Sequence, residues 1–258
     1  MANDVQVQKK QTIGNFLNLP NTAKFLEDNL REKRSEFVSN LIALCDNDDN
    51  LKECDPSKLM LCAMNATALN LPLNKNLGFA YIIPYKGVPS FQIGYKGLIQ
   101  LAIRSGAYEF LNACDVREGE ITRNKITGEI KFLGEKPEAK IIGYLAYLKL
   151  NTGFSASLYM TEAEMEAHAI RFSKMYQYDK ANKKTSSKWS DPLARPKMAL
   201  KTVLKGLLGT YGVLTTDLRT AFEKDDEQET GSTFRDIEDA NVINQTEEPK
   251  EVIKTVKI

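Results

Sequence analysis

The stretch FAYIIPYKGVPSFQIGYKGLIQLAIR, residues 79–104, decides how the middle of this chain folds. Its first half holds two apolar and aromatic runs, residues 79–85 and 88–93, on either side of Lys86-Gly87. Two β-prone runs joined by a short glycine-containing turn are typical of an antiparallel hairpin. The sequence therefore predicts a hairpin at this point.

Two further signals bound the hairpin. Pro84 and Pro89 flank its turn, and because proline cannot donate to a sheet ladder, we expect the hairpin at a sheet edge or projecting from it. Apolar residues then recur at helical spacing over residues 95–105, and Gly106 ends the pattern.

The chain before the hairpin reads as helical from about residue 13 to 69. Phe37, Leu41 and Leu44 recur at three- and four-residue spacing, as the buried face of a helix does. Asp55-Pro56 combines an N-cap acceptor with proline at the first helical position, which predicts a helix start.

After residue 106 the sequence predicts both strands and helices. Thr161 and Glu164 form a capping box that opens a helix to about Phe172, and Ser190-Asp191-Pro192 predicts another helix to about Leu208. The lysine-rich segment 173–190 reads as a mobile loop. The strands we expect are residues 108–116, 129–132, 141–150 and 154–159.

These elements predict an α+β fold. We expect one mixed domain, residues 1–222, with a helical N-terminal portion and a small antiparallel sheet from which the hairpin projects. Residues 223–258 are acidic and poor in apolar residues, which predicts a disordered tail.

Charge is unevenly distributed along the chain. Residues 1–222 hold 30 Lys and Arg against 23 Asp and Glu, whereas residues 223–258 hold 5 against 11. Residues 56–108 contain no Asp or Glu, while five cations and several aromatic residues fall there. A surface with cations and flat rings but no carboxylates suits a polyanion whose bases can stack, so the body is predicted to bind nucleic acid.

Two predicted helices carry cationic stripes. Lys96, Gln100 and Arg104 follow one another at four-residue spacing and share an arc of about 80°. The spacing recurs in a second stripe, Lys197, Lys201 and Lys205. A solvated lysine face is the common alternative, but such faces usually include glutamates at i,i+4, which both helices lack. We therefore interpret both stripes as phosphate contacts.

Other cations and aromatic residues lie near these stripes in the sequence. Phe91 and Tyr95 are candidates for base stacking or for the core. Trp189 would either stack on a base or anchor its loop. The remaining candidates for DNA contact are Lys86, Gln92, Arg171, Lys174 and Arg195.

Several function classes lack their signatures. The chain has no GxxxxGK[ST] loop, so an ATP-driven recombinase or helicase is disfavoured. The four cysteines lack CxxC spacing and there is one histidine, His168, so we expect no metal site and no cofactor. No apolar run reaches the roughly 18 residues of a membrane span. No set of nucleophile, base and orienting residue suggests catalysis.

Residues 71–85, 90–102 and 104–106 resemble the signature of the RecT family of phage recombinases. The helix start at Cys54-Asp-Pro56 and the helix around Met198–Val203 are similar to the same family, and the resemblance spans roughly residues 12–220. It implies a protein that anneals single strands without ATP or covalent chemistry. It also assigns DNA binding to residues 91–104 and 195–205.

The resemblance further implies partners and a setting. Expected partners are single-stranded DNA, the annealed duplex, further copies of the chain in a ring or filament, a phage exonuclease and host single-strand-binding protein. The expected location is the cytoplasm, at the nucleoid of a bacterial host. Two alternatives remain open: a sequence-specific duplex binder using residues 95–105 as a recognition helix, and a nuclease, which the lack of paired carboxylates disfavours.

Overall fold

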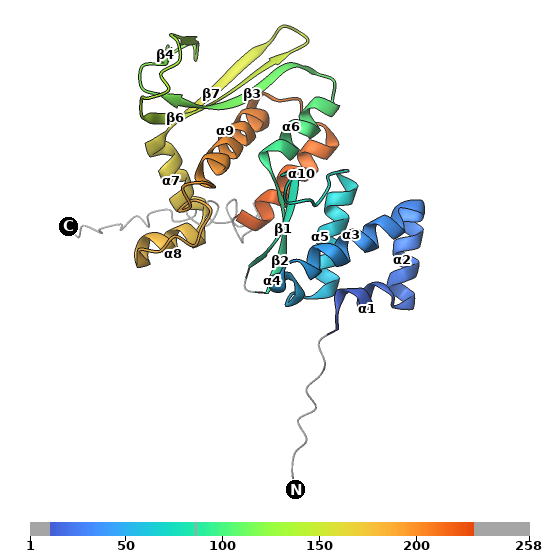
Figure 1. Cartoon of the computed structure of the whole chain (residues 1–258). Coiled ribbons are helices and arrows are strands. Elements are labelled where there is room, and N and C mark those ends of the chain that lie inside the picture. The colour runs from blue at the N-terminus through green and yellow to red at the C-terminus, as the bar shows by residue number, and fades with distance from the viewer. Residues whose placement is uncertain (1–10, 86, 230–258) are drawn as a thin grey trace, which may run out of the picture.

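The computed structural model describes residues 11–85 and 87–229. They form an α+β fold with small antiparallel sheets, as the sequence predicts (Figure 1). The strands are β1 (Ala80–Tyr85), β2 (Val88–Ile93), β3 (Tyr108–Arg117), β4 (Ile121–Arg123), β5 (Ile130–Phe132), β6 (Ile141–Leu150) and β7 (Ser155–Thr161). The helices are α1 (Ile13–Leu17), α2 (Pro20–Leu30), α3 (Arg34–Asp46), α4 (Asp49–Lys52), α5 (Pro56–Ala68), α6 (Tyr95–Arg104), α7 (Glu162–Phe172), α8 (Lys174–Asn182), α9 (Arg195–Tyr211) and α10 (Thr216–Glu229).

The helical N-terminal portion is built as its sequence indicates. α5 begins at Pro56, and the Asp55 side chain accepts a hydrogen bond from the Lys58 backbone N–H at 2.9 Å. Leu59, Ala63 and Ala66 bury the inner face of this helix, which packs against the β1–β2 hairpin.

The predicted hairpin is confirmed as an antiparallel pair, with Ala80 opposite Ile93 and Tyr85 opposite Val88. It forms a two-stranded sheet of its own rather than the edge of a larger one. Alternate residues of the pair, including Ile82 and Ile93, are buried because α5 and α10 pack against it.

The larger sheet has the strand order β3-β6-β7, and all its pairs are antiparallel. Helix α9 packs against this sheet, beneath it in Figure 1, with Val203 and Leu207 fully buried. Every second residue of β6 from Tyr144 to Leu148 is buried: Tyr144, Ala146 and Leu148. β4 and β5 form a separate small pair.

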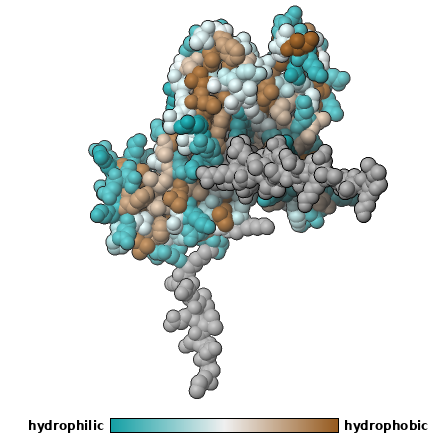
Figure 2. Space-filling view, turned by 180° about the vertical axis from the view of Figure 1, so that it is seen from behind, coloured by the Kyte–Doolittle hydropathy of each residue, from teal (hydrophilic) through white to brown (hydrophobic). Residues whose placement is uncertain are grey.

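The surface is mostly hydrophilic but carries hydrophobic side chains in places (Figure 2). The β4–β5 end exposes Ile126, Phe132 and Leu133, and β3 exposes Phe110. Three cysteines, Cys45, Cys54 and Cys62, are buried, while Cys114 is exposed. Burial is the main cause that raises the pKa of Cys45 to about 11, so this thiol is inert at neutral pH.

Residues 173–190 were expected to be a mobile loop, and this prediction is wrong for residues 174–182, which form α8. Residues 183–190 are turns and irregular chain, as expected of a loop. Ser173 caps α8 by accepting from the Tyr176 backbone N–H at 3.2 Å. The turn after α8 closes around Asp179, which is 1% exposed and accepts from Ser187 N–H and Ser190 Oγ at 2.7 Å each. These polar residues look loop-like in sequence because their partners lie eight and eleven positions away.

The C-terminal boundary also differs from the prediction. α10 continues to Glu229, so residues 223–229 belong to a helix, and residues 230–258 lie outside the described part of the chain. Leu218, Ala221 and Asp225 recur at three- and four-residue spacing and are all fully buried. That short buried stripe orders a segment whose composition alone suggests disorder.

Gly97 lets α6 pack closely against the start of β1. A Cβ at this position would overlap the carbonyl oxygen of Phe79 and would lie 2.8 Å from the Ile93 side chain. Gly97→Ala should therefore lower the free energy of unfolding by about 1–3 kcal/mol, measured by urea denaturation. Gly14→Ala is the control: its nearest neighbour is Ile42 Cδ1 at 3.7 Å. The control should change stability by less than about 1 kcal/mol, in the stabilising direction; equal losses in both variants would contradict the packing argument.

Asp179 should make the free energy of unfolding depend on pH in the acid range. Burial by itself raises the pKa of this carboxyl, but hydrogen bonds from Ser190 and Ser187 outweigh it and hold the pKa at about 2, against 3.8 ordinarily. Its contribution to stability is therefore complete above about pH 4 and is lost as pH falls towards 2. Between pH 5 and pH 3, urea denaturation should show a smaller loss for Asp179→Asn than for the unsubstituted protein. Asp28→Asn, at an exposed carboxylate on α2, should behave like the unsubstituted protein.

Candidate nucleic-acid interface

The α9 stripe faces water only at its start. Lys197 is exposed, but Lys201 is 6% exposed and the Lys205 side chain is 18% exposed. Both inner lysines form ion pairs of 2.7 Å with Asp225 of α10. α10 covers the second half of the stripe, so Lys201 and Lys205 face Asp225 in this structure, and their role as phosphate contacts stays a prediction.

Sequence reasoning missed Asp225, which it placed in a disordered tail. Its carboxylate is fully buried and accepts hydrogen bonds from Lys201 Nζ, Lys205 Nζ and the Ile93 backbone N–H, the last at 3.3 Å. Burial raises the pKa of Asp225, but the two lysines outweigh it and the pKa falls below its ordinary value. The residue is therefore an ionised carboxylate that joins α10, α9 and β2. Its only sequence signal was its place on the buried stripe of α10.

The three residues of the α6 stripe also differ in exposure and in their partners. Lys96 is exposed and Gln100 is half-buried. Arg104 donates from its guanidinium to the carbonyl oxygens of Leu69 at 2.7 Å and Asn70 at 2.8 Å. Those carbonyls belong to the C-terminal end of α5, so Arg104 caps that helix, although its side chain is still exposed.

The aromatic residues in and beside the hairpin differ in exposure. Phe91 is fully buried, so the expectation that it stacks on a base does not hold in this structure. It faces inward because it belongs to the alternate set of β2 residues that packs towards α5. Tyr95 is half-buried, and Gln92 donates to the Tyr85 hydroxyl at 2.9 Å. Lys86 lies outside the described residues.

Helices α7 and α8 present two exposed cations, Arg171 and Lys174. The Arg171 guanidinium lies 5.1 Å from the centre of the Phe172 ring. Burial lowers the pKa of His168, and the nearby charges of Lys205 and Arg171 lower it further. Arg195 at the start of α9 pairs with Glu162 and Glu166 of α7, so these two helices lie side by side there.

Trp189 and Arg195 belong to a buried network rather than to a free surface. Trp189 is 6% exposed, which corrects the expectation that it stacks on a base and supports the alternative that it anchors its loop. Arg195 pairs with Glu162 at 2.8 Å and with Glu166 at 3.1 Å. Tyr176 also donates to Glu166, at 2.6 Å. A guanidinium held by two carboxylates is not available to a phosphate in this conformation.

Four residues of the predicted set keep exposed cationic side chains: Lys96, Arg171, Lys174 and Lys197. Of the helices that carry them, α9 lies between α7 and α6 in Figure 1 and packs against α6. These four cations are exposed and come from four different helices. An arrangement of this kind can bind phosphates without reading base sequence.

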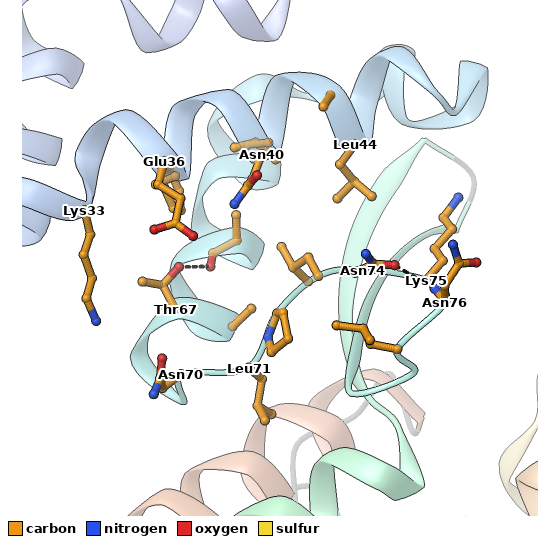
Figure 3. A pocket seen from close by; sticks show the side chains of 18 of the residues that line it. Lys33, Glu36, Asn40, Leu44, Thr67, Asn70, Leu71, Asn74, Lys75 and Asn76 are labelled. Carbon is orange, nitrogen blue, oxygen red and sulfur yellow. Dashed lines mark hydrogen bonds between the residues drawn. The ribbon is translucent and has the colours of Figure 1, made fainter.

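A separate groove of about 700 Å³ lies between α3 and the loop after α5 (Figure 3). Asn40 and Leu44 of α3 face Asn70 and Asn74 across it, and Glu36 contributes a carboxylate. Asn74 Oδ1 accepts from the Asn76 backbone N–H at 2.9 Å, which holds the loop in its turn. The groove shares only the Arg104 cap on Asn70 with the cationic stripes.

Within residues 11–85 and 87–229, no group of three or more His, Cys, Asp or Glu side chains is arranged to hold a metal ion. In the same part of the chain no helix is long and apolar enough to span a membrane.

The sequence of this chain matches a known protein family and two known proteins. The model of the RecT family matches residues 35–243. The chain is 37% identical over 222 residues to the uncharacterized protein YqaK of Bacillus subtilis (strain 168), covering 85% of this chain and 74% of that protein. It is also 30% identical over 127 residues to Protein RecT of Escherichia coli (strain K12), covering 45% of this chain and 47% of that protein. Because the family model covers most of the chain, the chain belongs to the RecT family.

Proposed function

We propose that this protein binds single-stranded DNA and anneals complementary strands without hydrolysing a nucleotide. Membership of the RecT family, whose members are annealing proteins rather than classical enzymes, suggests single-strand annealing in recombination. The observation that carries the proposal to particular residues is the set of exposed cations on α6, α7, α8 and α9.

The physical basis is charge neutralisation. Lys96, Lys197, Arg171 and Lys174 contact phosphates, so binding releases counterions and is independent of sequence. Reduced repulsion between two strands favours duplex formation, and an assembly of many copies raises the local concentration of strands. The proposal therefore includes an oligomer, a ring or filament, as the working form.

The setting we propose is recombination in a phage or prophage, at the nucleoid of a bacterial host. The partners in that setting are the annealed duplex, an exonuclease that resects double-stranded ends, and host single-strand-binding protein. Residues 230–258 lie outside the described part of the chain; for their acidic sequence a solubilising segment and a docking site for these partners are the two alternatives.

Annealing itself is tested with two oligonucleotides and no ATP. The purified protein, bound to one labelled strand, should pair with the complement many times faster than the naked strand does, and large complexes should form. A non-complementary strand is the control and should give no duplex. Tight binding with no acceleration, as a monomer or dimer that protects one duplex site, would favour the alternative of a sequence-specific duplex binder.

Charge reversal tests the interface. Lys197→Glu and Lys96→Glu should each weaken binding to a poly(dT) oligonucleotide roughly tenfold, because two unit charges next to a phosphate are worth about 1–2 kcal/mol in a hydrated site. The slope of log K against log salt should fall by about 0.7 per lost contact. Lys24→Glu, an exposed lysine of α2, is the matched control and should leave affinity within about twofold. Equal effects of all three substitutions, measured by fluorescence anisotropy, would show that net charge and not the positions of Lys197 and Lys96 governs binding.

A further inference from the structure

The Asp225 carboxylate occupies an anion site whose donors come from other elements. Lys201 Nζ and Lys205 Nζ approach from α9, each at 2.7 Å, and the Ile93 N–H approaches from the end of β2 at 3.3 Å. Two ammonium groups and one peptide N–H are the donor set that also suits a phosphate oxygen. The stripe of α9 therefore includes a built oxyanion site, which α10 closes.

The segment that closes the site is itself acidic. α10 contains Asp217, Glu223, Asp225, Asp226, Glu227 and Glu229 against Arg219 and Lys224. Among its residues with described side chains, Leu218, Ala221 and Asp225 are fully buried, while Phe222 packs partly against the core. The helix is therefore attached to the body by a short apolar stripe and by the ion pairs of one carboxylate.

This closure has a consequence for DNA binding. Lys197, at the start of the stripe, is exposed, whereas Lys201 and Lys205, one and two turns further along, face Asp225. A strand that follows the stripe from Lys197 reaches an acidic helix after one turn. Exchange of the carboxylate for a phosphate keeps an anion beside the two lysines, so it avoids leaving buried charges without a partner.

We propose that α10 is an internal competitor of DNA, in which Asp225 stands in the position of a backbone phosphate until a single strand displaces the helix. This inference rests on the proposed binding of single-stranded DNA and adds a closed state to it. The ligand of the opened site is a phosphodiester, held by Lys201, Lys205 and the Ile93 N–H.

Hydrogen–deuterium exchange on the full chain tests the displacement directly. With saturating poly(dT) oligonucleotide, the amides of residues 218–224 should exchange at least about tenfold faster than in the free protein. The amides of α3, which packs against α1, α2 and α4, are the internal control and should not speed up. Unchanged or slower exchange in α10, with binding shown by anisotropy in the same sample, would overturn the proposal.

A substitution gives an independent readout. Asp225→Asn should tighten oligonucleotide binding at least about threefold and make the salt slope steeper by roughly 1.4, which is 0.7 for each of two added phosphate contacts. Glu223→Gln removes the same charge from an exposed position of the same helix, where the side chain is 63% exposed and pairs with Arg219, and should change neither quantity. Unchanged or weaker binding by Asp225→Asn with a native circular dichroism spectrum would show that Asp225 only stabilises the fold. If that variant does not fold, the exchange experiment decides.

The binding of single-stranded DNA and the closed state of α10 can be told apart by experiment. If neither the unsubstituted protein nor Asp225→Asn binds oligonucleotide, the proposed function fails and the closed state fails with it. If the unsubstituted protein binds and anneals while α10 stays protected, only the competitor role is lost.

Discussion

The pairing of one buried carboxylate with two lysines of α9 organises the C-terminal part of this molecule. Asp225 has no exposed surface, and its partners lie on a helix twenty or more residues earlier and on a strand 132 residues earlier. A buried charge is costly unless it is paired and hydrogen-bonded, so α10, α9 and β2 hold one relative position as long as the carboxylate stays in place. The position of α10 in turn decides which cations of α9 face water.

The four-residue spacing of Lys197, Lys201 and Lys205 correctly places them on one arc of one helix. It does not say what lies over that arc, because the covering residue comes from a segment that looks like an acidic tail. The same limit applies to Arg104, which continues the α6 stripe but donates to the carbonyls that end α5. A charge pattern thus predicts which residues share a face, while long-range pairing decides whether that face is free.

Local sequence signals predicted an element correctly wherever the contacts that form it are close in sequence. The cap at Asp55, the capping box at Thr161 and the β1–β2 turn were predictable because each interaction spans a few residues. α8 and α10 were not, since polar residues order them through distant partners, Ser187 and Ser190 in one case and the α9 lysines in the other. Phe91 and Trp189 were ambiguous for a related reason: an aromatic side chain suits both a base and a core, and only the packed fold decides between them.

The burial of these two rings bears on how an annealing protein should hold DNA. A base stacked on the protein gains about 1–3 kcal/mol and must be released before it can pair. Contacts made through phosphates do not compete with pairing, because they leave the Watson–Crick edges free. With Lys96, Arg171, Lys174 and Lys197 exposed and the rings of Phe91 and Trp189 buried, the proposed contacts are of the phosphate kind, which leaves the bases of a bound strand free to pair. An acidic helix over the remaining lysines is consistent with the same requirement, since it limits how tightly a strand is held before its complement arrives.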